Sequence, residues 1–394
     1  FWDPVENASL MPWLISTALI HSLTVTQNKH QFYNWTILLA IFGFSFSLLG
    51  TFIVRSGLLT SVHAFASDPT RGVFILIILA FSTLIPLFLY AFKDTYRNET
   101  RFLIFSKETG LLLNNIFLVT STLIILIGTL YPLILETVNS SKISVGAAYY
   151  NSTFAPIMIP FIMIMTFAPF LGWTNTPKNS LFKNIFIIFI LTCFLTSLIF
   201  IYNPSSIFGI ICGYLSILLF FSVGLSFLKK LNNLKKLPLN FYGMLIAHLG
   251  LAIFLFGVTG EQFFKKETSS QIRINETIFL NNYNLKLENV NKIKIDNYLS
   301  ESGFFRITKN GEFIGKIVSE QRFYPAERTK TTEAGIFSFF LSDIYITMGE
   351  GNFEEGWIVR AYYNPLVKCL WFGAFFMALG GVVSLFSKTN RRFI

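Results

Sequence analysis

The chain has 394 residues, of which 53% are hydrophobic, 17% aromatic and only 13% charged. An average soluble domain carries about 25% charged residues, so this chain has too few to cover a water-facing surface. The composition therefore excludes a soluble enzyme, a disordered chain and a disulfide-stapled secreted domain. It indicates a polytopic membrane protein.

Nine apolar runs are long enough to cross a bilayer, which takes about 20 residues per helix. They are predicted at residues 10–27, 35–54, 73–92, 114–135, 153–173, 185–201, 207–228, 241–260 and 364–387. We therefore expect an all-α membrane protein of about nine transmembrane helices. Residues 1–260 would form a transmembrane core, and residues 364–394 the last helix and a cytoplasmic tail.

The net charge of +10 indicates topology and not nucleic-acid binding, because the cations are unevenly distributed among the loops. One set of loops holds fourteen: Lys29, Lys93, Arg97, Arg101, Lys107, Lys178, Lys183, Lys229, Lys230, Lys235, Lys236, Lys388, Arg391 and Arg392. The opposite set holds Arg55, Arg71 and Lys142. The positive-inside rule places the first set in the cytoplasm. The expected location is a bacterial inner membrane, or the mitochondrial inner membrane if the chain is organellar.

Residues 261–363, on the outer (periplasmic) face, resemble an ordinary water-soluble domain. Apolar and polar residues alternate at 272–274, 283–287, 292–295, 304–307 and 313–318, and Lys309-Asn310-Gly311 is a turn signal. Such alternation is typical of half-buried strands. A small β-rich domain is therefore predicted before the last helix.

The cysteines Cys193, Cys212 and Cys369 all lie in predicted spans and form no C-x-x-C or C-x-x-C-H motif. We interpret them as apolar filler, since free cysteine behaves as a small hydrophobe. Neither dithiol redox chemistry nor covalent haem attachment to this chain is expected.

Two of the four histidines occur at matched depth in different spans. His21 is six residues from the inner end of the first span, and His248 is seven residues into the eighth, so both lie roughly 10 Å inside the same face. Such a pair could supply the axial ligands of a b-type haem, which Ala247, Gly250 and Ala252 would let approach. The alternative is two buried histidines bonded to carbonyls or to Thr17 and Thr24.

His63 lies in an outer loop, on the same face as the N-terminal residues. The side chains of Trp2, Trp13, Phe65, Arg55 and Arg71 could build a haem platform around it, in which aromatic rings stack on the porphyrin and arginine binds propionates. The alternative is an interfacial aromatic belt with a solvated histidine. His30, beside Lys29, is expected to be a solvated loop residue.

The run Phe1-Trp2-Asp3-Pro4-Val5-Glu6-Asn7-Ala8-Ser9 resembles the tryptophan-rich WWD haem-handling motif, entered after its first tryptophans. Together with Leu19-Ile20-His21-Ser22, Gly50–Ala66 and Ala247-His248-Leu249-Gly250, it is similar to the CcmF family, the haem lyase subunits of System I cytochrome c maturation. The similarity extends over effectively the whole chain.

The resemblance implies that His21 and His248 ligate a buried haem b. It also implies that His63 is one of two histidines flanking a haem held at the WWD loop, with Trp2, Asp3 and Trp13 lining that platform. The family's other external histidine lies upstream of this loop, so the chain is expected to be truncated at its N-terminus.

The implied reaction joins the vinyl groups of haem to the thiols of a C-x-x-C-H motif in apocytochrome c. Expected partners are a haem chaperone, apocytochrome c with its thiol-handling and recruiting subunits, the lipid bilayer and a quinol. No catalytic residue is identified: Asp3 and Glu6 are candidates for proton transfer, and structural roles are the alternative. The other functional hypotheses are a haem transporter or exporter, and a non-catalytic subunit that recruits the apocytochrome.

Overall fold

A computed structural model describes residues 2–56, 69–92, 103–139, 143, 145–173, 176–202, 205–232, 237–326 and 328–387. The chain divides into two compact units, Phe1–Ile187 and Ile188–Ile394. The division falls inside a helix, and each unit is described by itself below.

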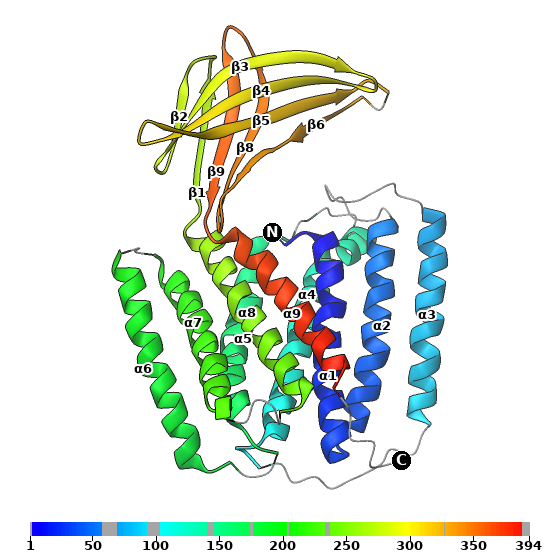
Figure 1. The fold of residues 1–394 in the computed structure, drawn as a ribbon. Coiled ribbons are helices and arrows are strands. Elements are labelled where there is room, and N and C mark those ends of the chain that lie inside the picture. Colours follow the sequence, from blue (N-terminus) through cyan, green and yellow to red (C-terminus); the bar gives the residue numbers. More distant parts are fainter. Residues whose placement is uncertain are drawn as a thin grey trace. The chain divides into compact units, whose positions relative to one another are not determined.

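Within the described residues, nine helices are long and apolar enough to cross a membrane (Figure 1). They are α1 (Pro4–Lys29), α2 (Tyr33–Arg55), α3 (Pro69–Ala91), α4 (Lys107–Asn139), α5 (Ala147–Phe167), α6 (Lys178–Tyr202), α7 (Ile207–Leu228), α8 (Leu239–Phe263) and α9 (Val367–Leu385). A β-sandwich lies between α8 and α9 in the chain. The prediction of a multi-pass membrane protein with a β-rich domain before its last helix is confirmed.

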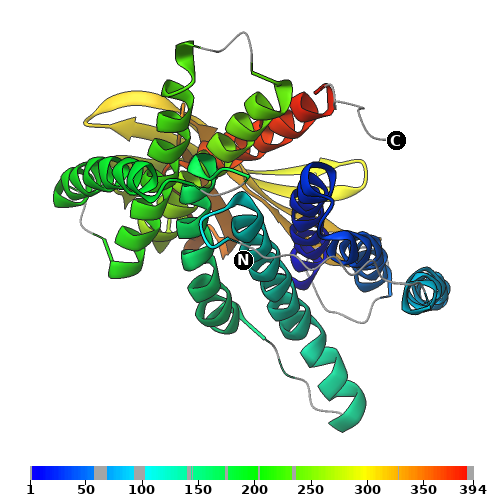
Figure 2. The same cartoon turned by 90° about the horizontal axis from the view of Figure 1, so that it is seen from below.

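In the first unit, neighbouring helices pack in the order α3, α2, α1, α4, α5 (Figure 2). Helices α1 and α2 approach closely at Gly50, where a Cβ atom would lie 2.7 Å from the carbonyl oxygen of Ala8. Helix α4 begins beside the end of α1, where Lys29 Nζ lies 3.5 Å from Glu108 Oε1. Because the acidic residue is in the first turn of α4 and the lysine in the last turn of α1, both charges also complement the helix dipoles.

In the second unit, α8 and α9 are packed backbone to backbone through glycine. Gly243, Gly250 and Gly257 recur every seven residues on α8, and a Cβ atom on any of them would lie within 3 Å of α9 atoms. Gly373 and Gly380 meet them from α9, also seven residues apart. Small residues at this spacing let two membrane helices approach closely enough for extensive dispersion contact.

The sandwich consists of β1 (Lys266–Ile272), β2 (Thr277–Leu280), β3 (Tyr283–Ile295), β4 (Tyr298–Lys309), β5 (Glu312–Tyr324), β6 (Thr329–Glu333), β7 (Gly335–Ser338), β8 (Asp343–Asn352) and β9 (Gly356–Asn364). One sheet has the order β1-β9-β8-β7 and the other β2-β3-β4-β5-β6. Residues from both sheets form one core, including the fully buried Leu287, Phe305, Ile346 and Trp357.

Four of the five predicted segments lie in β3, β4 and β5, which are longer than predicted. The prediction at 272–274 is wrong beyond Ile272, where β1 ends and a turn follows. The segments at 283–287 and 292–295 belong to one strand, β3. A bulge between Leu287 and Asn289 reverses the side-chain alternation along this strand. The turn predicted at Lys309-Asn310-Gly311 connects β4 to β5, with positive φ at Asn310 and Gly311. Strands β2, β6, β7, β8 and β9 were not predicted from the sequence. The residues of β6 are polar and all exposed.

Candidate functional site

The candidate site begins at the N-terminus of α1, and Asp3 determines where that helix starts. The Asp3 carboxylate accepts a hydrogen bond of 2.8 Å from the backbone N–H of Val5, and Pro4 occupies the first helical turn. Aspartate before proline is a strong N-terminal signal. Helix α1 therefore starts at Pro4, six residues before the predicted span.

Trp2 joins this helix start to α5 in the first unit. Its indole ring stacks on Tyr150 at 4.7 Å between centroids, with 13° between the planes, and meets Phe154 edge-on at 5.1 Å. The Trp2 Nε1–H donates a 2.9 Å hydrogen bond to Asn151 Oδ1. The tryptophan is thus held by three side chains of a single helix.

Buried hydrogen-bonding groups of α1 and α4 adjoin this aromatic cluster at Tyr150. Asn7, which is 2% exposed, donates a 3.1 Å hydrogen bond from Nδ2 to Thr129 Oγ1 on α4. Thr129 Oγ1 lies 3.3 Å from the hydroxyl of Tyr150. Gly128 makes room for the ring, since a Cβ atom there would lie 2.8 Å from Tyr150 Cε1. Together these residues tie α1, α4 and α5 into one rigid support for Trp2.

Asn7, Thr129, Tyr150 and Asn151 were not identified from the sequence. One signal was available for Asn7, because this polar residue falls on the face of α1 that is otherwise apolar and buried. The buried residues of α1 are Asn7, Ala8, Met11, Leu14, Ile15, Ala18, Ser22 and Val25. No local pattern predicts that Trp2 contacts Asn151, which is 149 residues away in the chain.

His21 lies at the edge of the buried face of α1, eight residues before the helix ends at Lys29. Its Nδ1 is 2.8 Å from the carbonyl oxygen of Thr17. A carbonyl only accepts, so Nδ1 carries the proton and Nε2 keeps its lone pair. This is the tautomer that iron-ligating histidines use, with the distal nitrogen oriented by a backbone bond. The hydrogen bond to a carbonyl anticipated as the alternative to haem ligation is therefore compatible with both roles.

His248 lies nine residues into α8 in the second unit and is half-buried. Gly250 contacts α9 at Gly373 and Met377. Two residues along a helix differ by about 160° in direction, so His248 points to the side of α8 away from α9. The expectation that the small residues near His248 admit a macrocycle is wrong for Ala247 and Gly250, which make room for α9. The carbonyl of Ala252 accepts a hydrogen bond from Ser216 on α7.

The remaining predicted site residues are spread along the first unit. Trp13 lies nine residues beyond Pro4 on α1, about 13 Å further along its axis, and is 47% exposed. Arg55 is the last residue of α2, with an exposed side chain. His63 lies outside the described residues. The structure brings Trp2 and Asp3 together at the start of α1, and Trp13 does not share their cluster.

Two family models match parts of the chain. Residues 263–365 match the CcmF C-terminal beta-sandwich, and residues 1–60 match the family described as cytochrome C assembly protein. The first match covers all nine strands of the sandwich, and the second covers α1 and α2 with the aromatic cluster's Trp2.

Curated relatives match almost the whole chain. It is 40% identical to the cytochrome c-type biogenesis protein CycK of Rhizobium meliloti, over 99% of this chain and 60% of that protein. It is 35% identical to the cytochrome c-type biogenesis protein CcmF of Escherichia coli, over 100% of this chain and 61% of that protein. The chain therefore spans about three fifths of the relatives that it matches.

A solved structure described as cytochrome c heme lyase CcmF shares the fold. The TM-score is 0.76 at 22% sequence identity, and the match covers 98% of this chain and 60% of that one.

Proposed function

Since the chain belongs to the CcmF/CycK family of cytochrome c-type biogenesis proteins, we propose that it is the part of a haem lyase that joins haem to apocytochrome c. The observation that carries the proposal is the chemistry of the N-terminal region. A tryptophan is fixed at one end of α1 by α5, and a histidine oriented by the Thr17 carbonyl through its Nδ1 lies on the same helix.

Two imidazole side chains are the donor chemistry of a bis-histidine haem b, and we propose His21 and His248 as its axial ligands. His21 has the tautomer that presents Nε2, and His248 is the only other histidine inside a membrane helix of the described residues. The Thr17 carbonyl orients His21, and the Lys29–Glu108 pair fixes the end of its helix against α4. A haem bound here supplies one-electron transfer, and we propose a quinol as the electron source.

At the outer face, a second haem is the substrate of the reaction. Trp2 offers an aromatic edge whose position is fixed by Tyr150 and Asn151, while Asp3 holds the start of α1 through Val5 N–H. His63 is the proposed iron ligand there, and Trp13 on α1 and Arg55 at the end of α2 are proposed to line the platform. His21 thus lies nearer the end of α1 opposite to Trp2.

In the proposed reaction, each cysteine S–H of the apocytochrome adds across a vinyl C=C of the substrate haem. An S–C bond forms, the hydrogen goes to the neighbouring carbon, and no oxidant is consumed. The chain's contribution is to hold two vinyl groups against two thiols, since such positioning can replace most of the entropic cost of the encounter. The proposed partners are a haem chaperone, apocytochrome c and its thiol-handling subunits, and the proposed location is the bacterial inner membrane.

The alternatives are a haem transporter and a subunit that only recruits the apocytochrome. A transporter is expected to contain inverted repeats or paired broken helices, and neither is predicted from the sequence. A recruiting subunit has no use for two membrane-embedded histidines. The haem spectrum of the purified protein distinguishes the haem lyase from both alternatives.

The test is the absorption spectrum of the chain purified in detergent from cells that make haem. We expect a low-spin b-type spectrum with two histidine ligands, which His21→Ala or His248→Ala reduces at least tenfold per mole of protein. His30→Ala is the matched control, because His30 is an exposed residue in the αL position after α1. Circular dichroism checks that each variant retains its helices.

A colourless preparation with intact helices would contradict the haem assignment. An equal loss of haem in His30→Ala would also contradict it, since that result shows that any histidine change near α1 disturbs the fold.

A further inference from the structure

The long strands β3, β4 and β5 extend past the end of the opposite sheet of the sandwich (Figure 1). In β3, residues 291–295 are exposed on both faces, whereas Leu285 and Leu287 of the same strand are buried in the core. The opposite sheet reaches the inner face of this extension through Trp357, Phe353 and Glu350, which contact Glu301, Lys292 and Lys330. Beyond these contacts the face is open, and Leu299 is 44% exposed. We call this face the shelf, defined by residues Lys292, Lys294, Leu299, Glu301, Gln321, Phe323 and Lys330.

Strand register places four shelf residues in one row across the sheet. Lys294 of β3 pairs with Leu299 of β4, and Leu299 with Phe323 of β5. Phe323 pairs in turn with Lys330 of β6. Directly paired residues point to the same side of a sheet, so the row has two apolar side chains in its centre and an ammonium group at each end.

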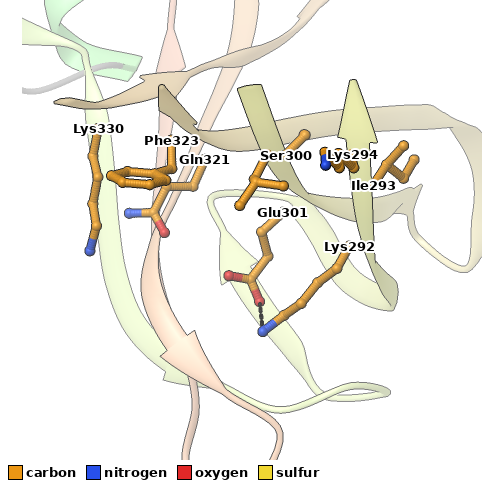
Figure 3. Close-up of a pocket in the computed structure, with 9 residues that line it drawn as sticks. Lys292, Ile293, Lys294, Ser300, Glu301, Gln321, Phe323 and Lys330 are labelled. Carbon is orange, nitrogen blue, oxygen red and sulfur yellow. Dashed lines mark ion pairs between the residues drawn. The ribbon is translucent and has the colours of Figure 1, made fainter. Parts of the chain in front are cut away.

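This row faces inward, toward the side that the other sheet covers elsewhere. Glu301, two residues from Leu299 on β4, accepts a 3.1 Å hydrogen bond from Nε1 of Trp357 on β9. Residues two apart in a strand share a face, so Leu299 lies on that face as well. The shelf bounds a cavity of about 430 Å³, within the usual range for ligand sites. Figure 3 shows Phe323, Gln321 and Lys330 on one side of it, and Glu301 with Lys292 on the other.

The shelf carries positive charge that its own residues do not balance. Three lysines line the cavity with one carboxylate, Glu301, and that group is engaged by Lys292 at 3.4 Å. Lys330 pairs with Glu350, but both side chains are more than half exposed, so this pair is weak and open to exchange. Lys294 has no carboxylate partner among the described residues.

On the opposite face of the same sheet, the charges of the ion-paired side chains balance one another. There three carboxylates pair with three cations: Glu288 bonds to Lys316 and Arg306, and Glu320 and Glu333 both pair with Arg322. The bonds to Lys316 and Arg306 hold the pKa of Glu288 below its ordinary value. Charge on the sandwich is thus compensated where the surface faces water on its outer side. On the inner face, Lys292 and Lys330 have carboxylate partners, and the charge left over is that of Lys294.

We propose that the shelf binds an extended polypeptide segment of a partner protein with two acidic residues four positions apart and an apolar residue midway between them. Three strand spacings separate Lys294 from Lys330, about 14 Å, and residues i and i+4 of an extended chain are about 13 Å apart. Residue i+2 points to the same side and would cover Leu299 and Phe323. The segment lies across the strands on the open part of the shelf.

The shelf lies in the second unit alone and needs no haem, so its peptide binding can be tested whether or not the chain attaches haem. The probe is a fluorescein-labelled heptapeptide of sequence Ser-Glu-Ser-Leu-Ser-Glu-Ser with blocked ends, titrated by anisotropy into the intact chain in detergent. We expect saturable binding that weakens as salt is added. A peptide of the same composition with its glutamates two positions apart should bind at least tenfold more weakly.

The protein variants test the two parts of the row. Lys294→Glu should weaken binding at least tenfold, and Phe323→Ala several-fold. Lys266→Glu is the matched control, because Lys266 is an exposed lysine on β1 of the other sheet. A peptide with lysine in place of one glutamate should restore binding to Lys294→Glu, which also shows that this variant is folded.

The proposal is overturned if the two glutamate spacings bind equally, or if Lys294→Glu binds like Lys266→Glu. Failure of the lysine peptide to restore binding to Lys294→Glu would have the same meaning. Preferential binding of a linear dicarboxylate such as dodecanedioate would assign the row to a small amphiphile instead. Concentration-dependent self-association that Lys294→Glu abolishes, without peptide binding, would assign it to a second copy of the chain.

Discussion

At the scale of single residues, Trp2 and Asp3 at the start of α1 are proposed to line a haem platform and also hold the helix in place. The carboxylate of Asp3 is used as the helix cap, so its candidacy for proton transfer competes with a bond that determines where α1 begins. Trp2 is held through both its ring face and its N–H. Fixing an aromatic side chain in this way limits its motion before any ligand arrives.

Substitutions of Trp2 should separate these two contacts. Trp2→Phe keeps the stacking on Tyr150 and loses the bond to Asn151, so we expect it to lower the free energy of unfolding by about 1 kcal/mol. Trp2→Ala loses both and should cost about 1–3 kcal/mol. Thermal unfolding of the chain in detergent measures the order of the two effects.

Trp13→Ala is the control, because Trp13 is on the same helix and is 47% exposed. We expect a smaller loss than for Trp2→Ala. An equal loss for Trp2→Ala and Trp13→Ala would mean that the contacts of Trp2 with α5 do not stabilise the first unit.

At the scale of elements, glycine spacing determines how α8 and α9 pair. The two helices touch where Gly243, Gly250 and Gly257 face Gly373 and Gly380. This close contact also orients His248, since the residue opposite the glycine face is turned away from α9. The glycine packing of α8 thereby determines the direction in which His248, a candidate haem ligand, points.

Two adjacent glycines of α9 provide a matched test of this packing. Gly380→Ala would bring a Cβ atom to 2.5 Å from the backbone of Ala247 and Gly243, so the helices must separate. Gly381→Ala meets nothing within 4 Å and should be neutral or stabilising by up to about 1 kcal/mol. We expect Gly380→Ala alone to lower the midpoint of thermal unfolding by several degrees.

The same pair of variants should differ in haem content if His248 is a ligand, because only Gly380→Ala displaces α8. Equal midpoints for the two variants would show that the contact between α8 and α9 does not limit the stability of the second unit.

At the scale of the whole molecule, the distribution of lysine and arginine predicts which side of the membrane each loop occupies. The β-sandwich follows the end of α8 opposite to the loop that contains Lys229 and Lys230. Placing that loop in the cytoplasm therefore places the sandwich and its shelf outside. A partner segment for the shelf is then expected on the outer side.

Single cysteines test this topology in cells with a permeabilised outer membrane. We expect a membrane-impermeant maleimide to label Ser270→Cys in β1 and not Lys230→Cys, until the inner membrane is opened. Both positions are exposed. The unchanged chain gives the background from Cys193, Cys212 and Cys369, which lie in membrane helices. Labelling of Lys230→Cys in intact membranes would reverse the predicted orientation.

Hydropathy and local signals were sufficient to predict the nine spans, the inserted β domain and the turn at Asn310-Gly311, because length, alternation and positive φ are local properties of the chain. The matched depths of His21 and His248 stay a prediction, as does their ligation of haem. Three features were not predictable from the sequence. They are the contacts of Trp2 with α5, the packing of α8 on α9 through glycines seven residues apart, and the row from Lys294 to Lys330. Each depends on pairing between segments distant in sequence, and a side chain's neighbours follow from that pairing and not from its own spacing.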